Sequence, residues 1–254
     1  MAASSKTVIK SASPGFMHQA GVLSERYLDV FLSDFPSLFL LVFQPLAVAI
    51  CTGLVWKGTS GSATLYFVLV FSAVFFGCVN ACREIVKEKV IFGRERLVGL
   101  QIPAYIASKF WVLGILGLGQ ALLFYLGVRY FLVLEGNPVL VLLTLYFSTL
   151  AGTALGLCIS AFVSADVMAM TLVPVALIPQ LLFSKVVMPN KSLTGAAAWL
   201  EKLTLVKWSY LSMEQLVASS VQWGTVLQGW SILLAMSAVL ILLSAMILKM
   251  KESF

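Results

Sequence analysis

Long stretches without any charged side chain are the feature that most constrains the fold of this chain. Six such stretches are present, at residues 35–56, 58–82, 110–128, 136–165, 167–184 and 215–248. A helix satisfies its own backbone hydrogen bonds, and about 20 mainly apolar residues cross the hydrocarbon core of a bilayer. The sequence therefore predicts six transmembrane helices, at about residues 36–56, 62–82, 103–131, 138–163, 167–187 and 226–248.

The composition agrees with a membrane protein and excludes other classes. Hydrophobic residues make up 60% of the 254 residues and charged residues 11%, whereas soluble domains have roughly 25% charged residues. An aromatic content of 12% excludes a disordered chain, and four Cys are too few for a disulfide scaffold. The predicted fold class is an all-α integral membrane protein, with residues 21–254 forming one transmembrane domain.

The distribution of basic residues predicts the orientation in the membrane. Eight of the 14 residues at 83–96, between the second and third spans, are charged, and five of these are Lys or Arg. Because basic residues favour the cytosolic side, this linker and both termini should be cytosolic, with residues 1–20 forming a flexible tail. The net charge of +6 then indicates a bias toward the membrane surface and no nucleic-acid partner.

The segments outside the spans have two kinds of pattern. Residues 21–34 place apolar side chains at helical spacing, which predicts an amphipathic helix along the membrane surface. Residues 188–225 are rich in Trp, Tyr and Leu, which predicts one or two short helices dipping into the outer leaflet as a re-entrant segment. Asn190 begins an Asn-Lys-Ser pattern that fits an N-glycosylation acceptor.

Two further patterns concern helix packing and the linker. Gly152, Gly156 and Ser160 recur at every fourth residue, which lets a second helix approach closely. Pro174 and Pro179 predict a kinked fifth span. The mixed charges of the linker indicate a protein partner or, alternatively, a solvated loop that only sets the topology.

The chain lacks the residues for its own catalysis or energy supply. Its single histidine, His18, lies near the N-terminus, and no metal-ligand motif or phosphate-binding glycine loop occurs. We therefore expect no catalytic residue and no metal site. The sequence describes a pathway or a scaffold that depends on another protein for energy.

The linker and the start of the third span resemble a known family. Residues 80–109, NACREIVKEKVIFGRERLVGLQIPAYIASK, are similar to the corresponding segment of type 2 ABC permeases of the G subfamily. The likeness is strongest to bacterial chains in which a forkhead-associated domain, an ATPase and this permease are fused. The matching positions are Glu88, Ile91, Phe92, Arg94, Glu95, Gly99, Ala104, Tyr105 and Lys109. Residues 195–216 resemble the outer re-entrant helix of the same family, and residues 21–34 its connecting helix.

The resemblance implies an ABC exporter half that works as a dimer with a cytosolic ATPase, which would bind ATP and Mg²⁺. The linker at 83–100 would be a coupling helix, with Glu88, Arg94 and Glu95 transmitting the motion. Phe76, Ile178 and Leu181 would line the substrate cavity. Val186 and Val187 would form an outer apolar plug, although the family usually has leucines there.

An apolar cavity of this kind suits a lipophilic or amphipathic substrate. The outer Cys residues of animal members are missing, which favours a bacterial inner membrane and argues against a glycan on Asn190. A non-transporting scaffold or receptor subunit would have the same fold without a continuous cavity. A membrane-embedded enzyme is the third possibility, and turnover without ATP would identify it.

Overall fold

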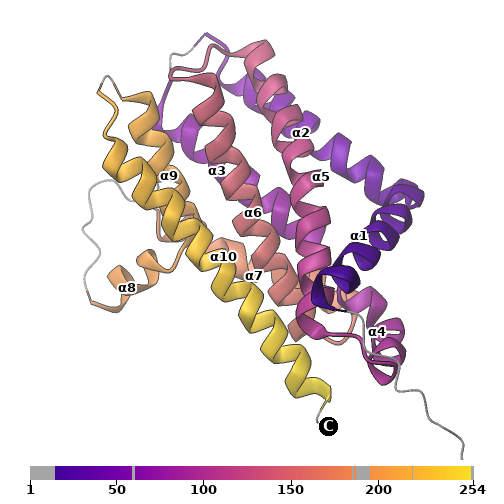
Figure 1. The fold of residues 1–254 in the computed structure, drawn as a ribbon. Coiled ribbons are helices and arrows are strands. Elements are labelled where there is room, and N and C mark those ends of the chain that lie inside the picture. Colours follow the sequence, from indigo (N-terminus) through magenta and orange to yellow (C-terminus); the bar gives the residue numbers. More distant parts are fainter. Residues whose placement is uncertain (1–14, 59–60, 185, 187–194, 219, 253–254) are drawn as a thin grey trace, which may run out of the picture.

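The protein is a bundle of helices in its computed structural model, which describes residues 15–58, 61–184, 186, 195–218 and 220–252 (Figure 1). No β-strand occurs in these residues. The elements are α1 (Phe16–Ser33), α2 (Phe35–Val55), α3 (Ala63–Ala81), the 3-10 turn η1 (Val86–Glu88), α4 (Lys89–Leu97), α5 (Ile102–Phe131), α6 (Pro138–Phe162), α7 (Asp166–Leu182), α8 (Ala196–Lys202), α9 (Leu205–Val217) and α10 (Trp223–Glu252).

Five of the six predicted spans are present as helices long and apolar enough to cross a membrane, namely α2, α3, α5, α6 and α10. The remaining one, α7, has 17 residues and ends at Leu182, so the predicted helical end at residue 187 is wrong. The backbone N–H of Phe183 donates to Pro179 at 3.0 Å and that of Ser184 to Leu181 at 3.2 Å, which closes the helix in a tighter turn. Pro174 and Pro179 lie inside α7, as the sequence places them.

The bundle is built around α3, most of whose residues are buried against its neighbours. Its closest contact is with α6, where the two backbones touch. A Cβ atom added to Gly152 would lie 2.1 Å from the carbonyl oxygen of Val74, and one added to Gly156 would lie 2.4 Å from that of Cys78. From the other side, a Cβ on Gly77 would lie 2.0 Å from the oxygen of Thr149. Only glycine fits at these crossings.

The first helix begins earlier than the sequence predicts. Residues 16–20, assigned to a flexible tail, form the first turn of α1, while residues 1–14 lie outside the described part of the chain. Leu23, Tyr27 and Phe31 are buried at every fourth residue, and α1 packs on α5. Two other apolar residues of the amphipathic pattern, Val22 and Val30, remain 54% and 50% exposed, so the packed stripe is narrower than the pattern.

The outer segment contains two short helices within residues 195–218. α9 is buried against α3, α6 and α10, whereas α8 projects to one side of the bundle and leaves Trp199 71% exposed (Figure 1). Asn190, Val187 and the first residues of the predicted re-entrant segment lie outside the described residues.

Candidate functional site

The charged linker between α3 and α5 folds into η1 and α4 at one end of the bundle (Figure 1). Phe92 is the one buried residue of α4, and its ring packs on that of Tyr105 with centroids 4.8 Å apart. A helix of nine residues is too short to be stable alone in water, so its position depends on contacts with the bundle.

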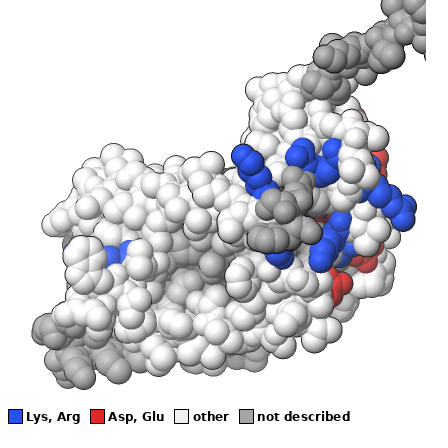
Figure 2. Space-filling model, turned by 90° about the horizontal axis from the view of Figure 1, so that it is seen from below, with Lys and Arg blue, Asp and Glu red and all other residues white. Residues whose placement is uncertain are grey.

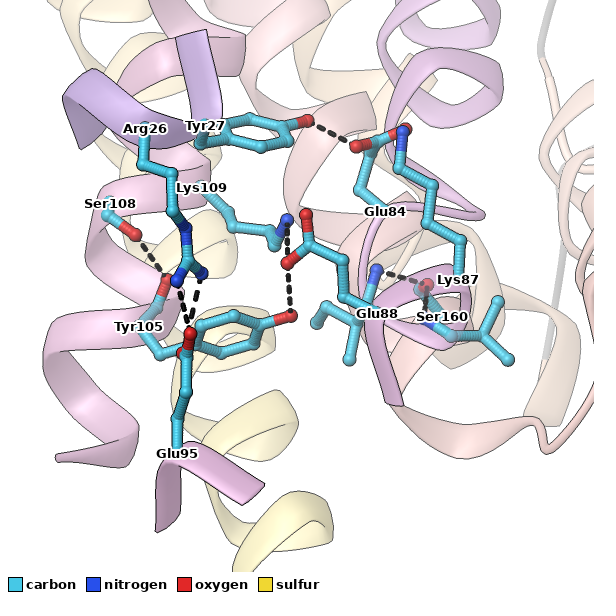
Figure 3. A network of polar contacts seen from close by, with 12 residues as sticks. Arg26, Tyr27, Glu84, Lys87, Glu88, Glu95, Tyr105, Ser108, Lys109 and Ser160 are labelled. Carbon is cyan, nitrogen blue, oxygen red and sulfur yellow. Dashed lines mark hydrogen bonds and ion pairs between the residues drawn. The ribbon is translucent and has the colours of Figure 1, made fainter. Parts of the chain in front are cut away.

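Glu88 connects the linker to α5. Its carboxylate lies 2.8 Å from the ammonium nitrogen of Lys109 and accepts a hydrogen bond from the hydroxyl of Tyr105 at 3.2 Å (Figure 3). The side chain of Lys109 is only 1% exposed, and its nitrogen lies 3.8 Å from the centre of the Tyr27 ring. An ammonium group this deeply buried requires a nearby carboxylate, so Glu88 and Lys109 depend on each other.

Two further carboxylates connect the linker to α1. The hydroxyl of Tyr27 donates to Glu84 at 2.5 Å, and the guanidinium of Arg26 donates to both carboxylate oxygens of Glu95 (Figure 3). Burial, reinforced by the Glu84 charge, raises the pKa of Tyr27 well above its usual value, so the phenol remains a donor. The hydrogen bond to Glu95 raises the pKa of Arg26. α1 is therefore fastened to both ends of the linker.

Backbone groups of the linker are also held. The Oγ of Ser160, in the last turn of α6, accepts the N–H groups of Ile85 at 2.9 Å and Val86 at 3.1 Å. The side-chain amide of Gln19 donates to the Gly99 carbonyl at 3.3 Å and accepts from the Gln101 N–H at 3.0 Å. Ser160, predicted as a small packing residue, thus acts as a hydrogen-bond acceptor for the linker.

The outward face of α4 differs in character from its inward face. Arg94 is exposed, and beside it on the linker Val90, Leu97 and Val98 are 67%, 89% and 86% exposed. Figure 2 views the molecule from this end and shows Lys and Arg gathered on it, with a few Asp and Glu beside them. Of the three predicted coupling residues, Arg94 faces outward, Glu88 points inward to Lys109, and the partly exposed Glu95 points to Arg26 of α1.

The predicted cavity residues occupy different environments. Phe76 is 1% exposed and meets Phe124 of α5 edge to face, with centroids 5.1 Å apart, so it belongs to the core and the prediction that it lines an open cavity is wrong. Ile178 is 55% exposed, and Leu181 is half-buried against the core. Val186, predicted as part of the outer plug, is half-buried, and its N–H donates to Ser184 Oγ at 3.1 Å.

The comparison with known proteins agrees with this arrangement. A model of the ABC-2 type transporter family matches residues 18–219, which include all but the first two residues of α1 and the whole of α2 through α9. The chain belongs to this family. It is therefore an integral membrane protein of the ABC transporter permease type, and the resemblance found at the linker is confirmed.

A fusion-type relative is also similar to the ABC-2 chain. The ABC transporter ATP-binding/permease protein of Mycobacterium tuberculosis is 28% identical over 184 residues. The match covers 66% of this chain and 21% of that protein, so the chain spans about a fifth of the length of its relative.

Sequence reasoning missed several residues of this ABC-2 permease's linker site. Arg26 and Tyr27 lie on a helix predicted to lie on the membrane surface, and Glu84 was counted only as a linker charge. The available signals were a hydroxyl on the apolar face of α1 and a lysine, Lys109, inside an apolar span. Within the described residues, no group of three His, Cys, Asp or Glu side chains is arranged to hold a metal ion.

Proposed function

We propose that the chain is the membrane-spanning permease subunit of an ATP-driven ABC exporter that moves a lipophilic or amphipathic substrate through a cavity between two copies. The ATPase would be a separate chain or a fused domain on the cytosolic side, where both termini lie. The observation that supports this proposal is the geometry of the linker: its inner side is held to the bundle by the buried Glu88–Lys109 pair and by the more exposed Arg26–Glu95 pair, and the outer face of α4 exposes apolar and basic side chains. A solvated topological loop needs neither property.

In this proposal the outward face of α4 is the docking surface for the ATPase. Val90, Ile91 and Arg94 would contact it, because exposed apolar residues beside a charge are typical of a protein interface. In this proposal Glu88 and Glu95 do not contact the ATPase but transmit the movement of the linker to the bundle. A shift of the linker would move α5 through the Glu88–Lys109 pair of η1 and α1 through the Arg26–Glu95 pair of α4, since each pair joins the linker to a longer helix.

The substrate cavity would lie against the faces of α3 and α7 that the monomer leaves open. On α3, Phe71, Phe75 and Val79 recur at every fourth residue and are half-buried, and on α7 the side chain of Ile178 is more than half exposed. We assign the cavity role to Phe75 in place of its neighbour Phe76. Apolar walls favour a lipophilic substrate, because each Å² of buried apolar surface contributes about 25 cal/mol. Leu181, Val186 and Val187 would belong to the outer end of the proposed cavity.

The test is reconstitution of the permease with its ATPase in liposomes. Arg94→Glu should abolish co-purification of the ATPase and the stimulation of its hydrolysis, without changing the unfolding of the permease. Lys249→Glu is the matched control, because Lys249 is an exposed basic residue at the same end, on α10. Equal behaviour of the two variants would contradict docking on α4.

A second variant separates transport from a scaffold function. Phe75→Ala should alter the transport or the substrate stimulation of hydrolysis while leaving ATPase association intact. If association requires Arg94 but no Phe75 variant affects any transported compound, the non-transporting scaffold is favoured.

A further inference from the structure

A cavity of about 450 Å³ lies between α4 and the ends of α6 and α10. Its inner walls are apolar and include the buried side chains of Phe92, Val163 and Leu248. Lys89, Arg96 and Lys251 lie at its more exposed edge. No acidic residue is among the described residues that line it.

Two of these cations contact backbone carbonyl groups of the protein. The ammonium of Lys251 donates to the carbonyl oxygens of Ala161, Phe162 and Val163 at 2.7 to 2.9 Å, so its three hydrogens are used at the end of α6. Arg96 donates to the carbonyl of Leu100.

This combination determines the chemistry of a ligand. An anion placed between Lys89 and Arg96 would lie beside two cations, with Lys251 at the same edge and no acidic side chain among the described lining residues. The apolar walls require an aliphatic group attached to that anion, since a free anion would leave them in contact with water. The cavity volume lies within the usual range of roughly 300–1,000 Å³ for small-molecule sites, enough for a headgroup and the upper part of an acyl chain.

The position of the cavity identifies the source of such a molecule. It lies where two helices of spanning length, α6 and α10, end, and there the phosphates of a bilayer are the most abundant anions. Basic pockets between transmembrane helices on the cytosolic side are known to bind anionic headgroups. We propose that this cavity binds one anionic phospholipid of the inner leaflet, with its phosphate at Lys89 and Arg96 and an acyl chain against Phe92 and Leu248.

The site adds a contact that the protein alone does not make. A lipid there would touch both α4 and α10, which have little direct contact with each other. It would also cover the end of α6. Binding of the lipid does not depend on ATPase docking, because Arg94 and Lys249 are not among the lining residues. The lipid site can therefore be tested on the purified chain, separately from the transport proposal.

The experiment is native mass spectrometry of the full chain released from neutral detergent and titrated with phosphatidylglycerol or phosphatidylcholine. We expect one phosphatidylglycerol per chain bound preferentially over phosphatidylcholine. Lys89→Ala should weaken this binding about five-fold, the loss expected for one cation beside an anionic lipid, and Lys89→Glu should weaken it further. Lys249→Glu is the matched control and should leave it unchanged.

Gly93→Leu blocks the cavity without removing a charge. Gly93 lines the cavity inside α4, and no atom lies within 4 Å of an added Cβ, so a leucine would occupy the space meant for the acyl chain. Leucine is also a better helix former than glycine, so α4 should remain folded. This variant should lose the bound phosphatidylglycerol while keeping the unfolding behaviour of the unsubstituted chain.

Three results would overturn the proposal. Equal binding of phosphatidylcholine would show that charge has no role in the site. Unchanged binding in both Lys89→Glu and Gly93→Leu would show that the lipid binds elsewhere. Competition by inorganic phosphate or glycerol phosphate at the same concentration as the lipid would identify a site for a soluble anion.

Discussion

Replacement of Lys109 by methionine tests the buried ion pair that connects the linker to α5. The substitution removes the ammonium but keeps an unbranched side chain of similar length. Glu88, whose side chain is 14% exposed, would then be a carboxylate without its cation. Breaking a buried pair from one side costs about 3–5 kcal/mol, because the remaining charge has lost both water and its partner.

The more exposed ion pair of the linker, Arg26–Glu95, gives a reference value for the destabilisation. Arg26 and Glu95 have side chains that are 43% and 24% exposed, and such pairs contribute only about 0–1 kcal/mol. We therefore expect Lys109→Met to destabilise the protein several times more than Arg26→Ala. For a protein of this size, about 3–5 kcal/mol corresponds to a fall in Tm of roughly 6–20 °C.

The assay is unfolding in mixed micelles, which gives the free energy of unfolding for the unsubstituted chain, each single variant and the double variant Glu88→Gln/Lys109→Met. The glutamine oxygen can still accept the hydrogen bond from Tyr105, and no charge remains buried. The double variant should therefore lie within about 2 kcal/mol of the unsubstituted chain. If its loss equals the sum of the two single losses, or if Lys109→Met costs no more than Arg26→Ala, the ion pair does not fasten the linker.

Three further predictions concern other contacts. Gly152→Val should prevent close packing of α3 and α6, because its Cβ would lie 2.1 Å from the carbonyl oxygen of Val74, and the folded peak in size-exclusion chromatography should be lost. Lys251→Met should lower the free energy of unfolding by about 1 kcal/mol, since the last carbonyls of α6 lose a cation. The raised pKa of Tyr27 means that the folded chain retains a proton that the unfolded chain releases, so stability is full below about pH 10 and falls above it. In Tyr27→Phe the fall above about pH 10 should be shallower.

Each of these variants has a matched control. Gly119→Ala lies on α5 where no atom is within 4 Å of the new Cβ, and it should fold normally. Lys249→Met removes a cation two residues from Lys251 without a described role at α6. Tyr130→Phe changes a phenol that is 83% exposed and should leave the alkaline fall in stability unchanged. A control that behaves like its test variant would contradict the corresponding contact.

The sequence located the spans well but not every helix end. Charge-free runs predict helix positions because a charged side chain is costly in hydrocarbon, and the starts of α2, α3, α5 and α6 lie within one residue of the prediction. The end of α7 was missed because hydropathy measures only how apolar a segment is. It does not detect the effect of the two prolines on the helix backbone. The first turn of α1 was missed because Gln19 is held by residues about 80 positions away.

The error at Phe76 has a geometric cause. Adjacent residues on a helix point about 100° apart, so a resemblance that is offset by one position selects a different face. In α3 nearly all residues are apolar, and no polar stripe in the sequence indicates which face is packed. Phe76 meets Phe124 in the core, whereas Phe75 lies on the half-exposed face.

By itself the sequence determined the class of this protein, the order of its spans and the segment that resembles an ABC coupling helix, because these depend on local composition and on a contiguous motif. Only the tertiary structure decided which charges of the linker point inward. The partners of Glu95 and Glu88, Arg26 and Lys109, lie on two other helices, and Ser160 of a third helix accepts the backbone N–H of Ile85. Arg26 is 69 residues from Glu95, and Ser160 is 75 residues from Ile85. The direction of a side chain is decided by burial and charge pairing across such distances, and helical periodicity does not encode it.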